Sequence, residues 1–267
     1  MKDGAYGSLR KAFRILELLA ARSPRGVLEI AAELELEKSG VSRLLQALSR
    51  WGYVVQNLRR GQYQLGPRVF ALVETYPQSD RLLREAQPVM KDLAQAARAT
   101  VHLGVAVDDH IILVAKEPSP ETIQLASRVG GRIAPHASAL GKVLLAGLPD
   151  KQRAPFLNAP LARFTDKTIT DRRELLEALR EIRSRGYALE AGEEHPGVGC
   201  IGAPIRGRAG SWIAALSISG PLRGTPFRVN ARHRDLILRA TDRISQRLAL
   251  PEEPTPAFGP LVGGSSP

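Results

Sequence analysis

The stretch from Lys38 to Arg50 restricts the fold of this chain more than any other part of the sequence. Wound at about 100° per residue, it forms a helix with an apolar side and a polar side. The apolar side consists of Val41, Leu44, Leu45 and Leu48. The polar side carries no acidic residue and consists of Ser39, Ser42, Arg43, Gln46 and Arg50. One side can therefore pack on a small core while the other stays exposed.

Two further helices are predicted ahead of this one. In 8–22, apolar residues recur at steps of three and four, and Ser8 can cap the helix. Turn residues at 23–26 lead to a short amphipathic helix over 27–34. Only a brief turn separates that helix from 38–50, and two short helices joined so tightly are typical of a helix-turn-helix.

A basic β-hairpin is predicted directly after the third helix. Tyr and Val in 53–55 and the alternation in 62–65 favour two strands. Between them, the segment 57–61 has the Asn and Gly of a hairpin tip and carries Arg59 and Arg60. Three helices followed by such a hairpin predict a winged helix-turn-helix over residues 6–66.

The chemistry of these side chains favours contact with duplex DNA. Arg and Gln have the donor geometry that suits purine edges in a major groove, and paired cations at a hairpin tip suit phosphate or a minor groove. The candidate DNA-binding residues are Lys38, Ser39, Ser42, Arg43, Gln46, Arg59 and Arg60. Two alternatives are a solvated amphipathic surface helix and a winged domain used for protein contact.

Charge and composition agree with an anionic partner. The chain has 267 residues, which suggests two domains, and a net charge of +11. Residues 1–76 carry +5 of that charge, so its density is highest there. Nucleic acid and an acidic membrane surface are the partners that such a charge favours. The single cysteine allows no intrachain disulfide, and no apolar run is long enough for a signal peptide or a membrane span, so we expect a cytoplasmic protein without a membrane partner.

The rest of the chain predicts a second, α+β domain over 81–250, joined by a linker over 67–80 that holds a short helix at 68–76. Antiparallel strand pairs alternate with helices grouped at their ends. We predict helices over 82–97, 138–148, 171–185 and 229–250, and strands over 100–107, 111–117, 123–128, 187–190, 198–206 and 212–219. The Pro-rich, Gly-rich residues 251–267 predict a disordered tail.

Several motifs of this second domain resemble one known family. They are Val-Gly-Gly-Arg-Ile-Ala-Pro-His-Ala-Ser-Ala-Leu-Gly-Lys-Val-Leu-Leu-Ala at 129–146, Arg-Gly-Tyr-Ala-Leu-Glu at 185–190 followed by Glu193, Gly-Val-Gly-Cys-Ile-Gly-Ala-Pro at 197–204, and Ala-Ala-Leu-Ser-Ile-Ser-Gly-Pro at 214–221. In this order they are similar to the IclR-type transcriptional regulators, and the likeness covers roughly residues 6–250. The resemblance implies a GAF-like effector-binding domain and a ligand-responsive regulator that binds double-stranded operator DNA as a homodimer or a dimer of dimers.

The residue chemistry also favours a small-molecule pocket. A helix capped by Ser138 leaves free N–H groups at Ala139, Leu140 and Gly141, which suit a carboxylate, so a small organic acid is the favoured effector. Two hydroxyls, Ser217 and Ser219, share one face of an apolar strand and need partners. By motif match, the resemblance implies effector-binding roles for Ala139, Leu140, Glu190, Val198, Cys200, Ser217 and Ser219. The family usually has Asp where this chain has Glu190, which leaves the identity of the ligand open.

Three alternative functions remain open at this point. Cys200 and His195 suggest a hydrolase, but they stand five residues apart with no orienting third group, and a small buried thiol is the simpler interpretation. In the second alternative, Cys200 makes the protein a redox-sensing regulator. In the third, the basic winged helix-turn-helix domain binds DNA as an architectural protein, without sequence preference. We expect no enzyme activity, no metal and no cofactor, since the five histidines are scattered and no phosphate-binding glycine loop is present.

Overall fold

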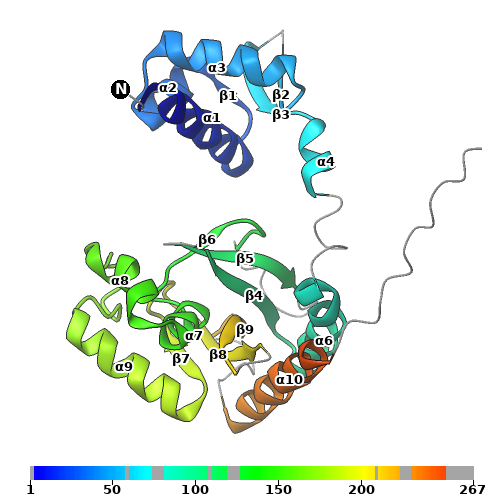
Figure 1. The fold of residues 1–267 in the computed structure, drawn as a ribbon, viewed down its shortest axis with the longest axis vertical. Coiled ribbons are helices and arrows are strands. Elements are labelled where there is room, and N and C mark those ends of the chain that lie inside the picture. The colour runs from blue at the N-terminus through cyan, green and yellow to red at the C-terminus, as the bar shows by residue number, and fades with distance from the viewer. Residues whose placement is uncertain are drawn as a thin grey trace, which may run out of the picture. The chain divides into compact units, whose positions relative to one another are not determined.

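The computed structural model describes residues 3–57, 60–73, 81–107, 110–118, 127–207, 210–222 and 230–250 (Figure 1). The chain divides into two compact units, Met1–Asp80 and Arg81–Pro267. The predicted tail 251–267 lies outside the described residues, as does the linker from 74 to 80. Among the described helices, none combines the length and the apolar character needed to cross a membrane.

The N-terminal unit has three helices, a small sheet and a short following helix. Its elements are α1 (Asp3–Ala21), β1 (Arg25–Gly26), α2 (Val27–Leu34), α3 (Lys38–Arg50), β2 (Val54–Asn57), β3 (Gln62–Leu65) and α4 (Arg68–Val73). The second and third helices have the predicted bounds, and α1 begins earlier than expected. The three helices and the hairpin enclose one core, which contains Ile15, Leu19, Ile30, Val41, Leu45 and Val54.

The sequence missed one strand of this unit. We expected 23–26 to be a turn only, but β1 pairs with β3 in an antiparallel arrangement, with Arg25 opposite Tyr63. The sheet order is therefore β1-β3-β2. A two-residue strand has no periodicity, so only its partner in the folded chain reveals it.

The C-terminal unit is an α+β domain, as predicted, built on a six-stranded antiparallel sheet. Its helices are α6 (Arg81–Ala97), α7 (Ala139–Gly147), α8 (Asp150–Asn158), α9 (Arg172–Arg185) and α10 (Ala231–Ala249). Its strands are β4 (Thr100–Val107), β5 (His110–Glu117), β6 (Arg132–Ile133), β7 (Ala188–Ala191), β8 (Val198–Arg206) and β9 (Trp212–Pro221). The strand order is β6-β5-β4-β9-β8-β7, which places β6 and β7 at opposite edges.

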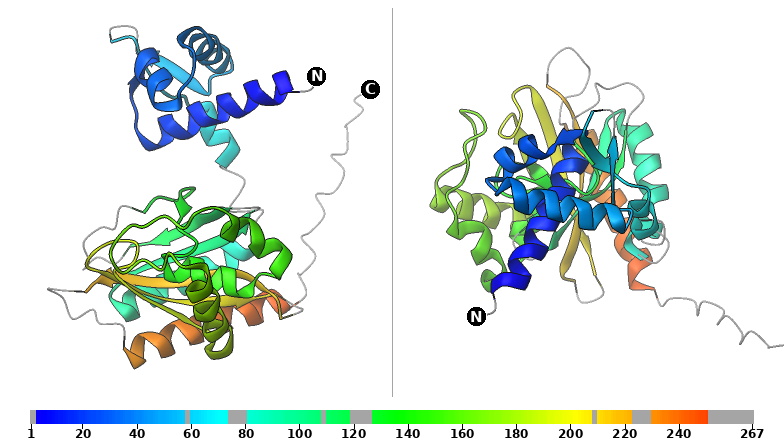
Figure 2. Two further views of the ribbon diagram at one scale, coloured as in Figure 1. Left: turned by 90° about the vertical axis from the view of Figure 1, so that its left-hand side faces the viewer. Right: turned by 90° about the horizontal axis from the view of Figure 1, so that it is seen from above.

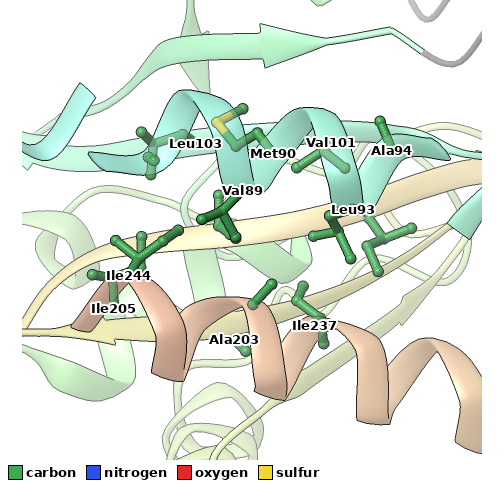
Figure 3. Packing of buried hydrophobic residues seen from close by; sticks show 14 of the residues in the cluster. Val89, Met90, Leu93, Ala94, Val101, Leu103, Ala203, Ile205, Ile237 and Ile244 are labelled. Atoms are coloured by element: carbon green, nitrogen blue, oxygen red, sulfur yellow. The ribbon is translucent and has the colours of Figure 1, made fainter. Parts of the chain in front are cut away.

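Helices cover both faces of this sheet (Figures 1 and 2). On one face, α6 and α10 pack on β4, β8 and β9, and Figure 3 shows the side chains of this core. On the other face, α7 lies on the same strands and is backed by α9, with Leu144, Leu175 and Leu179 in a second core. Alternation along each strand sends residues to the two faces in turn. In β9, Leu216 and Ile218 belong to the first core, and Ala215 belongs to the second.

Two elements of this unit were not predicted, and one expected strand is not tested. The helix α8 carries Pro155 inside it and has a weak apolar pattern, which hides it from periodicity. The strand β6 is only two residues long and pairs with β5 at the edge of the sheet. The strand expected over 123–128 lies mostly outside the described residues, and Ser127 and Arg128, which are described, are not in a strand.

Candidate nucleic-acid interface and ligand pocket

The helix α3 shows the division between apolar and polar sides that its sequence predicts. Val41 and Leu45 are both 0% exposed and belong to the core of the N-terminal unit. Of the candidate DNA-binding residues on this helix, Ser42 is half-buried, and those whose side chains are exposed are Lys38, Ser39, Arg43 and Gln46. The structure therefore presents a cationic, hydrogen-bonding stripe to solvent from a helix that is anchored by its opposite side.

The turn between α2 and α3 is short because Glu35 adopts a left-handed conformation, with φ of 54°. The backbone N–H of Leu36 donates to the carbonyl of Ala31 at 2.9 Å, which ends α2 and redirects the chain. Only residues 35–37 separate the two helices. This tight connection gives the arrangement of a helix-turn-helix.

The hairpin after α3 is a wing. β2 and β3 pair in antiparallel register, with Asn57 opposite Gln62. At its tip the backbone N–H of Gly61 donates to the carbonyl of Asn57 at 2.8 Å, and Gly61 has a φ of 63°, which suits glycine. Arg60 is exposed at this tip, whereas Arg59 lies outside the described residues. The exposed guanidinium of Arg60 is available to an anionic partner.

The C-terminal unit contains a pocket of about 520 Å³ on the face of the sheet that carries α7. This volume lies in the usual range for small-molecule sites. All seven residues expected to bind an effector line it: Ala139, Leu140, Glu190, Val198, Cys200, Ser217 and Ser219. They come from α7, β7, β8 and β9, so the sheet and the start of one helix bring together residues that are far apart in the sequence.

Helix α7 starts directly on the sheet, beside the pocket. Ser138 caps it by accepting a hydrogen bond from the backbone N–H of Gly141 at 2.9 Å. The prediction that Gly141 offers a free N–H was therefore wrong, because the cap uses it. Gly202 of β8 lies beneath this turn, and a Cβ built there would be 2.9 Å from the carbonyl oxygen of Ala139. The close approach of backbone to backbone fixes the position of the helix start.

Other pocket-lining residues were missed by the sequence analysis as members of a binding site. They are His102, Ser127, Arg128, Gly131, Arg132, Ile133, Ser138, Glu194 and His195. His102 stands in the apolar strand β4, and a polar residue at a buried strand position was the signal that could have identified it. His195, which the sequence suggests only as a partner for Cys200, also lines the pocket.

His102 is a neutral hydrogen-bonding group on the pocket floor. Its Nε2 lies 2.8 Å from Oγ of Ser127, and its Nδ1 lies 3.4 Å from Oγ of Ser219. Burial, with a smaller contribution from Lys116, lowers the pKa of His102 to about 4. Near neutral pH the ring therefore donates one hydrogen bond and accepts another, and it adds no charge.

The thiol of Cys200 is poorly suited to nucleophilic or redox chemistry. Burial, together with the neighbouring carboxyl of Glu190, raises the pKa of the Cys200 thiol. The thiolate is the reactive form, so such an environment suppresses reactivity. Cys200 instead hydrogen-bonds with Glu190 and Ser219, its cross-strand neighbours on β7 and β9. These contacts correspond to a structural thiol in the pocket wall.

The loop between β7 and β8 closes one side of the pocket and is tied down at several points. Nζ of Lys142 lies 2.5 Å from Oε1 of Glu193 in an almost fully buried ion pair. Thr168 Oγ1 donates to the carbonyl of Glu193 at 2.7 Å, and Thr165 Oγ1 donates to that of Gly192 at 2.7 Å. The backbone N–H of Glu193 donates to Glu190. Residues from α7 and from the segment before α9 thus hold this wall in place.

Comparisons with known proteins agree with this architecture. Residues 8–58 match the IclR helix-turn-helix domain, and residues 74–246 match the C-terminal domain of bacterial transcriptional regulators of the IclR type. The regulator BhcR of Paracoccus denitrificans is 34% identical over 249 residues, which cover 92% of this chain and 89% of that protein. The repressor AllR of Salmonella paratyphi A is 31% identical over 216 residues, which cover 80% and 79%.

A solved structure is also similar. The IclR homologue from Microbacterium hydrocarbonoxydans complexed with 4-hydroxybenzoate has a TM-score of 0.77 and 26% identity, over 90% of this chain and 98% of that one. The relatives are transcriptional regulators and not enzymes, and neither cysteine-based alternative finds support among them. This chain belongs to the IclR family of transcriptional regulators, whose members bind DNA through the N-terminal helix-turn-helix and an effector through the C-terminal domain.

Proposed function

We propose that α3 reads base edges in a major groove through Arg43 and Gln46. The observation that carries this proposal is that both side chains are exposed on a helix whose Val41 and Leu45 are fully buried. In this proposal Lys38, Ser39 and Ser42 contact bases or phosphates beside them. Arg60, with Arg59, contacts phosphate or the minor groove from the wing.

An operator sequence is first selected from random duplexes by its binding to the protein. The test then compares the affinity of the Arg43→Ala variant for this operator and for random DNA at one salt concentration. Loss of a bidentate contact to a base costs about 1–3 kcal/mol, so we expect operator affinity to fall roughly tenfold or more while random DNA is much less affected. Arg180→Ala removes the same charge from an exposed position on α9 and serves as the control. Equal losses on both DNAs refute base reading by Arg43 and favour an architectural binder.

We further propose that the pocket binds the effector and that 81–250 forms the effector-binding domain, with 6–66 as the DNA-binding domain and 67–80 as the linker. The favoured effector is a small organic acid, because the start of α7 and the hydroxyls of Ser217 and Ser219 line the same cavity. The double variant Ser217→Ala, Ser219→Ala should keep operator affinity and lose sensitivity to the effector. Ser184→Ala on the exposed side of α9 is the matched control.

The active form is, in this proposal, a homodimer or a dimer of dimers in the cytoplasm. Exposed apolar side chains on the N-terminal unit support self-association: Leu9 and Phe13 of α1, and Phe70 and Leu72 of α4, are each more than half exposed. The DNA-binding domains of the two subunits then bind half-sites that lie about one helical turn, or a multiple of it, apart on the DNA. The effector favours one arrangement of the dimer over the other. The name of the Salmonella relative supports repression. Sedimentation with and without operator DNA measures how many subunits the protein contains.

A further inference from the structure

The charged side chains that line the pocket come from opposite edges of the sheet. Glu190 belongs to β7 at one edge, and Glu194 follows in the next loop. Arg132 belongs to β6 at the other edge, and Arg128 precedes it. All four line the same cavity. The sheet therefore gives this pocket an acidic wall and a basic wall.

No ion pair joins Glu190 or Glu194 of the acidic wall to a cation in the part of the chain that the structure describes. Glu190 is 3% exposed, and its hydrogen bonds come from the backbone N–H of Glu193 and from Cys200. Among the residues that the structure describes, only Glu193 of the three glutamates here forms an ion pair, with Lys142. A buried carboxylate without an ion-pair partner is costly, because it has lost water, and Lys142, which is paired with Glu193, offsets only a small part of that cost for Glu190. A cationic group in the cavity would remove this cost.

The basic wall favours an anion. Guanidinium groups match carboxylates in geometry and charge, and the start of α7 adds positive polarity beside them. A ligand that is only a carboxylate satisfies this wall and leaves Glu190 and Glu194 uncompensated. A ligand that is only a cation makes no use of the basic wall. A molecule with both charges, one at each end, complements both walls.

We propose that the pocket takes a dipolar ligand, with an amine cation held by Glu190 and Glu194 and a carboxylate held on the side of Arg128, Arg132 and the start of α7. The inference rests on the proposed effector-sensing function and names the chemical class of the effector. His102, Ser217 and Ser219 line the same cavity from the central strands β4 and β9, between the two edges of the sheet.

Proton exchange on binding distinguishes this ligand from a simple anion. Burial raises the pKa of Glu190 and of Glu194 in the free protein. An amine cation favours the ionised carboxyls and releases protons, so its affinity rises with pH through their titration. A ligand that is only an anion favours the protonated carboxyls, so its affinity falls over that range. The other titratable groups that face the two carboxyls are Glu193, Lys142, Cys200, His195 and His136.

The experiment uses two matched series on the full-length protein. The first is 6-aminohexanoate, 6-hydroxyhexanoate and hexanoate. The second is 4-(aminomethyl)benzoate, 4-(hydroxymethyl)benzoate and 4-methylbenzoate, with 4-hydroxybenzoate added because a structural relative binds it. Thermal shift ranks the compounds, since a ligand that binds only the folded state raises the melting temperature. Calorimetry in two buffers of different ionisation enthalpy then counts the protons released or taken up.

We expect an amine member of one series to bind at least tenfold more tightly than its hydroxyl and methyl counterparts, with net proton release in the pH range over which the two carboxyls titrate. Glu190→Gln should weaken binding of that amine at least tenfold and reduce the proton release. The melting temperature of this variant without ligand shows whether it folds. Glu181→Gln, at an exposed position on α9, should change neither.

Each other outcome is decisive. If a hydroxyl or methyl compound binds as tightly as its amine, or Glu190→Gln leaves amine binding unchanged, the dipolar class is wrong and the effector pocket stands. If no amine of either series binds, the dipolar class is again wrong. If, in addition, a broad panel of carboxylates alters neither the melting temperature nor operator affinity, the proposed effector-sensing function fails as well.

Discussion

Lys142 of α7 and Glu193 of the loop after β7 form an ion pair inside the C-terminal unit, with only 3% and 14% of their side chains exposed. Oε2 of Glu193 has no hydrogen-bond partner among the residues that the structure describes, so the charge of this carboxylate depends on Lys142. The pair joins the helix that begins at the pocket to the loop that forms its acidic wall. Its geometry therefore couples the stability of the unit to the shape of the cavity.

Lys142→Met should destabilise the C-terminal unit strongly. Removing one partner of a buried pair leaves the other charge uncompensated, at a cost of about 3–5 kcal/mol. Urea unfolding followed by circular dichroism measures this loss. Arg243→Met breaks an exposed pair with Asp92, and that change should cost less than about 1 kcal/mol. Equal losses in the two variants would mean that the Lys142 pair contributes no more than a surface pair.

His102 should make stability depend on pH. Its pKa is about 4 in the folded protein and 6.5 in the unfolded chain, so below pH 6.5 the unfolded state binds a proton that the folded state does not. This contribution to stability is complete above pH 6.5 and is lost as pH falls toward 4. Between pH 7 and pH 5, the free energy of unfolding falls by about 2 kcal/mol because of His102, since each pKa unit corresponds to about 1.4 kcal/mol.

The variant His102→Gln isolates that contribution. Glutamine can hydrogen-bond but does not titrate, so the variant should lose about 2 kcal/mol less than the natural protein between pH 7 and pH 5. Urea unfolding at both pH values gives the two differences. If both proteins lose the same free energy of unfolding between these pH values, groups other than His102 cause the sensitivity to acid.

Gly202→Ala should displace the start of α7. The added Cβ would stand 2.9 Å from the carbonyl oxygen of Ala139 and 3.0 Å from its carbon, and neither backbone atom can rotate away. Overpacking of this kind costs about 1–3 kcal/mol, and we also expect loss of the effector response. In Gly104→Ala the nearest atom is Cδ2 of Leu140, the end of a flexible side chain. That variant should be milder in thermal unfolding, and the reverse order would contradict the packing argument.

Leu45→Ala and Gln46→Ala should show that the two sides of α3 have different roles, one in folding and one in DNA binding. Leu45 is 0% exposed, and truncating it costs about 2–5 kcal/mol through the lost contacts and the cavity. Hydrogen exchange of the full chain should then show faster exchange in the N-terminal unit. Gln46→Ala should leave exchange unchanged and weaken operator binding only. If Gln46→Ala accelerates exchange as much as Leu45→Ala, the side chain of Gln46 has a structural role.

The sequence alone determined the features that depend on neighbours along the chain. The bounds of α2 and α3 follow from periodicity, and so does the burial of Val41 beside the exposure of Arg43. The cap at Ser138 also follows from local chemistry, and its hydroxyl accepts a hydrogen bond from the backbone N–H of the third residue after it. Period and cap are local properties, so a one-dimensional pattern is enough to predict them.

Only the tertiary structure decided which distant residues meet. Nothing local indicates that β6 and β7, at opposite edges of the sheet, supply Arg132 and Glu190 to one cavity. Nor does any local pattern indicate that His102 reaches Ser127 and Ser219. These contacts depend on strand order and on the packing of α7 against Gly202, which are set by long-range pairing and close packing rather than by the residues next along the chain.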